Sequence, residues 1–127
     1  MQKLTFHDKW DKSISPKDRK RIEEGFREAN ISENSQFEFT SLWEARNYKG
    51  ELLVTVLVHN LSKQPAAFDH IKIRYTEEEH EKVAEHTFSI ESLDIEPRTT
   101  MPWTFIFPFD SLEREPVFLN GRLNIVL

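Results

Sequence analysis

From residue 36 to the C-terminus, hydrophobic and polar residues mostly alternate, and a period of two predicts β-strands. In the first such segment, Phe37 and Phe39 fall on one face, while Glu38 and Thr40 fall on the other. The next segment, residues 51–60, is apolar on both faces, which predicts a central strand or one covered by a helix. Further strands are predicted at residues 71–76, 83–90, 93–95, 103–107 and 123–127.

One helix is predicted ahead of the strands, over about residues 16–29. Ser15 is a suitable N-cap, and Ile22 and Phe26 lie one turn apart, so we expect them to cover apolar surface of a sheet. Gly25 costs about 1 kcal/mol relative to alanine inside a helix, so docking must stabilise this element. The basic residues expected on its outer side are Lys17, Arg19 and Lys20.

These elements predict a mainly β fold, an antiparallel immunoglobulin-like β-sandwich of about seven strands with one N-terminal α-helix. A chain of 127 residues is the size of one domain. We therefore expect a single domain over residues 1–127, with the helix at about 16–29 and the sandwich at about 36–127. The alternation predicts a core that contains Val54, Val56, Val58, Ile73, Trp103, Phe105 and Phe107.

Charge is unevenly distributed along the chain. The net charge of −5 makes general attraction to phosphate backbones unfavourable, so no nucleic-acid partner is expected. Residues 1–21 hold seven basic and three acidic residues, whereas residues 77–96 hold one basic and eight acidic residues. This polarity could steer a basic partner or pair two copies into a homo-oligomer, although two solvated faces are the plainer interpretation. The acidic run, expected to be a solvated turn, is the candidate partner-binding surface and consists of Glu77, Glu78, Glu79 and Glu81.

The sequence contains no motif for catalysis or for binding a metal or cofactor. The five histidines lack metal-ligand spacing and there is no cysteine, so no metal site is predicted. His59 and His86 lie inside strand patterns, where semi-buried histidines are expected. No GxSxG motif surrounds a serine, and three glycines are too few for a glycine-rich phosphate loop. We therefore expect no catalytic residue, no cofactor and no enzyme activity.

The aromatic stripe at residues 103–109 has two interpretations, a stacking platform for sugars or single-stranded nucleic acid and a packed core. Thr104 and Ile106 lie between the aromatic residues, where a nucleic-acid platform would carry arginine or lysine. Core packing is therefore favoured.

No apolar run approaches the roughly 18 residues needed to span a bilayer. The N-terminal residues show neither the apolar segment nor the cleavage site that is typical of a signal peptide. We therefore expect no transmembrane segment and a cytoplasmic protein.

Several segments together resemble one known family. The strongest are the strand Gly50–Val58 followed by Asn60, the pair Glu96–Pro97, and the string Met101–Pro108. With the N-terminal segments His7–Trp10 and Ser15–Pro16, they resemble the SLAP domain family, which includes accessory Sec system S-layer assembly proteins of Gram-positive bacteria.

The resemblance implies a cytoplasmic, non-enzymatic component of accessory Sec-dependent export of S-layer proteins. Its expected partner is a secretory client or an accessory translocation component, bound at a sheet edge or at an apolar patch that the helix leaves uncovered. Assembly proteins of the family resemble two such domains in tandem, whereas this chain matches one. The alternative is a bacterial surface module or a carbohydrate-binding β-sandwich module.

Overall fold

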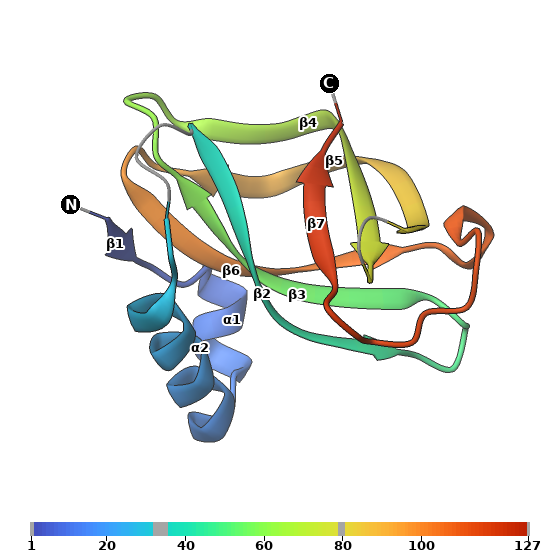
Figure 1. Cartoon of the computed structure of the whole chain (residues 1–127). Helices are drawn as coiled ribbons and strands as arrows, with labels where there is room; N and C mark the ends of the chain where they lie inside the picture. Colours follow the sequence, from blue (N-terminus) through green and yellow to red (C-terminus); the bar gives the residue numbers. More distant parts are fainter. Residues whose placement is uncertain (1, 32–35, 79–80, 127) are drawn as a thin grey trace.

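The computed structural model describes residues 2–31, 36–78 and 81–126, apart from the side chain of Ser92. It confirms a mainly β fold of two sheets with helices at the N-terminal end (Figure 1). One sheet has the strand order β1-β6-β3-β2 and the other has the order β5-β4-β7. The strands are β1 (Lys3–Leu4), β2 (Phe37–Arg46), β3 (Leu52–Asn60), β4 (Ala66–Glu77), β5 (Glu81–Ile95), β6 (Thr99–Phe107) and β7 (Arg122–Ile125).

Neighbouring strands are antiparallel, except that β1 runs parallel to β6. Two details differ from the sequence expectation. The segments predicted separately at 83–90 and 93–95 form one strand, β5, and the two-residue β1 was not predicted. The immunoglobulin-like type of sandwich stays a prediction.

The predicted helix is α2 (Pro16–Glu28), and a second helix, α1 (Asp8–Ser13), precedes it. The Ser15 hydroxyl accepts a hydrogen bond from the Asp18 N–H at 3.1 Å, as expected of an N-cap. The predicted helix is therefore confirmed, and the short α1 was not predicted because it has only six residues and no repeated apolar face. Arg19 was expected to point outward, but it is half-buried, pairs with Asp11 of α1 and lies over the Phe6 ring.

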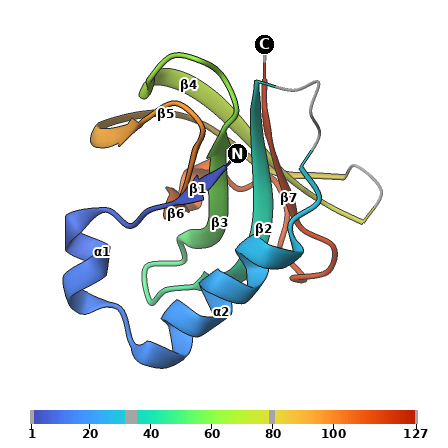
Figure 2. The same cartoon turned by 90° about the vertical axis from the view of Figure 1, so that its left-hand side faces the viewer.

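Helix α2 packs on the four-stranded sheet, on the face away from the core (Figure 2). Ile22 is fully buried and Phe26 is half-buried. A Cβ atom at Gly25 would lie 2.7 Å from Cδ2 of Leu42 on β2. Glycine therefore lets the helix approach the sheet closely, which explains a residue that weakens the helix in isolation.

The main core lies between the two sheets and is rich in aromatic rings. Phe105 stands at its centre, with ring centroids 5.2 Å from Phe88 and 5.6 Å from Phe68. The predicted core residues that are buried are Val54, Val56, Val58, Ile73, Phe105 and Phe107. The seventh predicted core residue, Trp103, is half-buried: it packs against the edge of this core and also stacks on Trp10 of α1, with ring centroids 6.4 Å apart.

Candidate protein-interaction surfaces

The acidic residues of the β4–β5 turn do not form one solvated surface. Glu77, the last residue of β4, is 3% exposed, so the expectation of a solvated turn was wrong for this residue. Glu78 is exposed, and Glu81 is exposed and forms an ion pair with Arg114. Glu79 lies outside the described residues. The role of these residues in binding stays a prediction, and Glu78 and Glu81 are the two that the structure places on the surface.

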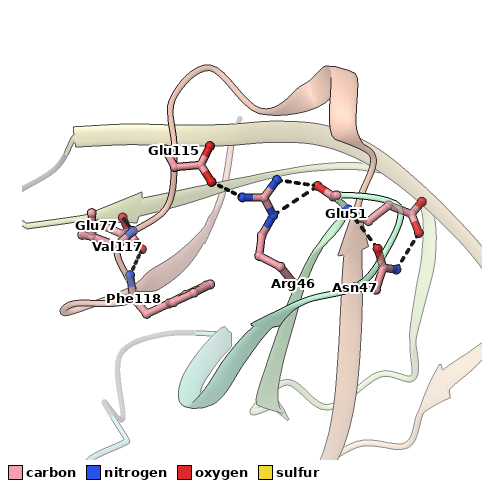
Figure 3. Close-up of polar contacts among 8 residues, drawn as sticks. Arg46, Asn47, Glu51, Glu77, Glu115, Val117 and Phe118 are labelled. Carbon is pink, nitrogen blue, oxygen red and sulfur yellow. Dashed lines mark hydrogen bonds and ion pairs between the residues drawn. The ribbon is translucent and has the colours of Figure 1, made fainter.

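The buried carboxylate of Glu77 holds the chain segment that leads into β7 (Figure 3). Its Oε1 accepts a hydrogen bond from the Val117 N–H at 3.0 Å, and its Oε2 accepts one from the Phe118 N–H at 2.8 Å. The Tyr75 hydroxyl donates a third, at 2.8 Å. These donors compensate the carboxylate for its lost hydration. The sequence analysis assigned Glu77 to the acidic run. Glu77 follows Ile73 and Tyr75 at intervals of two residues, however, and therefore lies on the same buried face of β4.

A second carboxylate lies on the other side of the Tyr75 hydroxyl. Oε1 of Glu44 on β2 is 3.4 Å from this oxygen. Burial raises the pKa of Glu44, with a further contribution from the Glu77 carboxylate. Burial and the hydrogen bond to Glu77 also raise the pKa of Tyr75, so its hydroxyl keeps its proton.

Gly121 lies directly against this cluster. A Cβ atom at this position would be 2.3 Å from the Tyr75 hydroxyl oxygen and 2.5 Å from Oε1 of Glu44. No side chain fits there without displacing a buried ring. The cluster therefore fixes both ends of residues 117–121.

Residues 108–121, which we call the connecting segment, pass from β6 in one sheet to β7 in the other. Arg46 ties this segment to the β2–β3 hairpin, since its guanidinium pairs with Glu115 and donates to the Gly50 carbonyl oxygen at 2.9 Å (Figure 3). The Glu113 N–H donates to the Val83 carbonyl oxygen of β5 at 2.7 Å. The segment is thus fixed to both sheets.

Six large hydrophobic side chains are exposed in the described part of the chain, and they lie on the β2–β3 hairpin, β6 and the connecting segment. In Figure 1, this hairpin and the connecting segment lie away from the two helices. Three of the six are consecutive, and we call them the apolar loop (Val117–Leu119). The six residues are Tyr48, Ile106, Phe109, Val117, Phe118 and Leu119.

A groove runs between β2 and β7, which are edge strands of the two sheets and lie next to each other in Figure 2. It consists of two hollows of about 360 and 420 Å³. The ladder with β3 leaves the backbone N–H and C=O groups of Phe39 and Ser41 directed away from β3. The ladder with β4 leaves those of Leu123 and Ile125 directed away from β4. The groove therefore presents strand edges to an extended chain.

His59 is fully buried, in agreement with the expectation of a core histidine. Its Nε2 is 2.7 Å from the Thr40 hydroxyl and its Nδ1 is 2.7 Å from the Thr100 hydroxyl. Burial lowers the pKa of His59 to about 4. His86 is half-buried, with its ring edge-to-face against Phe88.

In residues 2–31, 36–78 and 81–126, no cluster of three or more histidine, cysteine, aspartate or glutamate side chains could hold a metal ion. Over the same residues, every helix is too short or too polar to cross a membrane.

Comparison with known proteins gives one match. The family model described as SLAP domain matches residues 4–121. No curated protein and no solved structure matches the chain. The matched region runs from the end of β1 to Gly121, and so includes both helices, the β4–β5 turn and the apolar loop.

Proposed function

The chain belongs to the SLAP domain family, and on this premise we propose that it is a protein-binding module in accessory Sec-dependent export of S-layer proteins. It acts in the cytoplasm of a Gram-positive bacterium and catalyses no reaction. Its partner is a secretory client or an accessory translocation component. The observation that carries this proposal is the family match over residues 4–121.

The groove between β2 and β7 supports a role in binding protein. An extended segment of a client can add to a strand edge through main-chain hydrogen bonds, with side-chain contacts providing selectivity. Phe39 and Leu123 both line the two hollows, so the groove follows the open backbone groups of these two strands.

The buried polar clusters support a non-enzymatic role. His59 is engaged by two threonine hydroxyls, and Glu77 is engaged by Tyr75 and two backbone N–H groups. The His59 imidazole and the Glu77 carboxylate therefore both stabilise the packing of strands and loops.

The test is deletion of the gene in the native host combined with cell fractionation. The proposal expects a cytoplasmic pool of the protein, recovery of an export component or S-layer precursor with it, and reduced export of that precursor after deletion. Recovery from the cell wall alone, with unchanged export, would contradict the proposal and favour a surface or carbohydrate-binding module.

The contribution of the groove is tested separately with Ile125→Pro, which removes an N–H directed toward the groove. Loss of partner recovery by this variant, with β7 still protected from proteolysis, would support strand addition. Unchanged recovery would exclude the β7 edge as the binding site.

A further inference from the structure

We propose that the groove between β2 and β7 binds one extended segment of an unfolded secretory client, and that β7 pairs with the backbone of this segment with little dependence on its sequence. This inference rests on the proposed function and deepens it, because it selects the client over a folded translocation component as the partner at this groove. Three features support it, namely the open backbone groups of β7, the shape of the groove and the character of its lining.

The first feature is the open edge of β7. The Val126 N–H donates to the Lys72 carbonyl oxygen of β4 at 2.9 Å. Alternate residues of an antiparallel strand direct their backbone groups to opposite sides, so those of Leu123 and Ile125 are directed into the groove. Among the described residues, no other strand pairs with this edge of β7. An extended segment of about three residues can therefore pair with both Leu123 and Ile125.

The second feature is the wedge shape of the groove. At one end, the Ser41 hydroxyl of β2 donates to the Gly121 carbonyl oxygen at 2.7 Å. From this end the two strands diverge toward the start of β2 and the end of β7 (Figure 1). The hollows of about 360 and 420 Å³ lie along the wedge. The groove is thus a slot beside β7, closed at one end and faced by β2.

This shape distinguishes a single chain from a folded partner. Neighbouring strands of a sheet lie about 4.8 Å apart, so a folded sheet that docked on β7 would bring its second strand toward β2. A single extended chain has no second strand and fits between the two walls. The same argument disfavours a second copy of this chain, whose edge strands also belong to sheets. The slot therefore favours an unfolded segment.

The third feature is the lining of the groove. Polar atoms predominate over apolar ones at the surface of both hollows. The charged residues among those that line it are Glu38 and Arg122, which have opposite signs. In strand addition, backbone hydrogen bonds provide affinity and side-chain pockets provide selectivity. A mainly polar lining without a dominant charge therefore accepts many sequences, provided that their backbone groups are unpaired, as they are in an unfolded client.

Backbone methylation tests the pairing directly. The probe is a fluorescein-labelled heptapeptide of serine, threonine and valine, and its binding to the whole chain is measured by fluorescence anisotropy. Three N-methyl groups at alternate positions block one edge of the peptide, whereas three at consecutive central positions interrupt both edges. We expect the first peptide to bind within about threefold of the unmodified one, and the second at least about tenfold more weakly. A peptide of the same composition in shuffled order should also bind within about threefold.

Two proline variants locate the binding edge. Ile125→Pro removes an N–H directed into the groove and should weaken binding of the unmodified peptide at least about tenfold. Ile106→Pro makes the same substitution on the outer edge of β6. The Thr5 N–H donates to the Thr100 carbonyl oxygen there, so Ile106, an even number of residues further on, also directs its N–H away from β3. This control should leave the affinity unchanged.

Competition tests the folded state of the partner. A protein kept unfolded by reduction and alkylation of its cysteines should displace the labelled peptide. The same protein in its folded, disulfide-bonded state should leave the peptide bound.

The inference is overturned if the unmodified or the shuffled peptide does not bind, if the two methylated peptides bind equally, or if the folded protein displaces the peptide as well as the unfolded one does. These measurements use the unaltered chain, so they decide the matter even if Ile125→Pro does not fold. If the inference fails while the chain still associates with export components in the host, the proposed function stands. If the peptides bind as expected but deletion leaves export unchanged, the proposed function falls.

Discussion

Glu77 is a charged side chain in a buried position, and its hydrogen bonds explain how the fold accommodates it. One carboxylate oxygen accepts a hydrogen bond from the Val117 N–H, and the other accepts hydrogen bonds from the Phe118 N–H and the Tyr75 hydroxyl. A carboxylate supplies two acceptor oxygens, whereas an amide supplies one acceptor and one donor. The negative charge itself is therefore less important here than the presence of two acceptors.

This difference predicts the effect of Glu77→Gln. The amide NH₂ would face a backbone N–H donor, so we expect the free energy of unfolding to fall by about 1–3 kcal/mol. Chemical denaturation measures the change. Glu78→Gln, at the exposed neighbouring position, should stay within about 0.5 kcal/mol of the unaltered protein. Equal effects of the two substitutions would contradict the structural role of Glu77.

His59 predicts a pH dependence of stability. Its folded-state pKa of about 4 lies below the ordinary value of 6.5, so between these pH values the unfolded chain binds a proton that the folded chain does not. Stability from this residue is therefore complete above pH 6.5 and is lost as the pH falls toward 4, by up to about 3 kcal/mol. Denaturant unfolding at several pH values, compared with His59→Gln, isolates this contribution. A difference between the two proteins that is constant with pH would contradict it.

At the scale of elements, α2 depends on its contact with the four-stranded sheet. Phe26→Ala should lower the free energy of unfolding by about 2 kcal/mol, since the ring is only half-buried, and Ile22→Ala should lower it by about 2–5 kcal/mol. Lys20→Ala, on the exposed side, should change it by less than about 0.5 kcal/mol. These values are measured by denaturant unfolding. No effect of Ile22→Ala would show that the helix contributes nothing to the stability of the domain.

Elements with repeated patterns were predictable from the sequence, whereas isolated contacts were not. The cap at Ser15 and the alternation in β3 and β6 gave the correct structure because each rests on local chemistry. Helix α1 and strand β1 are stabilised by contacts with β6 and α2, which a short sequence window does not contain.

The candidate surfaces were only partly predictable for the same reason. Sheet edges and an uncovered apolar patch were expected as binding features, and the acidic turn was identified from its charge. The exposure of the apolar loop was not predictable, because the sequence Val117–Leu119 resembles any short core segment. Its exposure depends on the distant Glu77 carboxylate and on the close contact at Gly121.

At the scale of the whole molecule, the aromatic core joins the two sheets. Phe105 contacts rings from both sheets, namely Phe39 on β2 and Phe68 and Phe88 on β4 and β5. Phe105→Ala should therefore lower the free energy of unfolding by about 3–5 kcal/mol in a denaturant titration. A loss below about 1 kcal/mol would contradict its central position and would favour the stacking-platform interpretation of the aromatic stripe.

Because the connecting segment is attached to both sheets, its side chains can be exposed to solvent while its backbone is held in place. The side chains of Val117 and Phe118 face solvent, yet their amide hydrogens are held by a carboxylate at the end of β4. In hydrogen–deuterium exchange, these two amides should exchange slowly, at rates similar to those of the last residues of β4, because both become accessible only when this end of the strand opens. Solvent-exposed side chains and protected amide hydrogens would then occur in the same two residues.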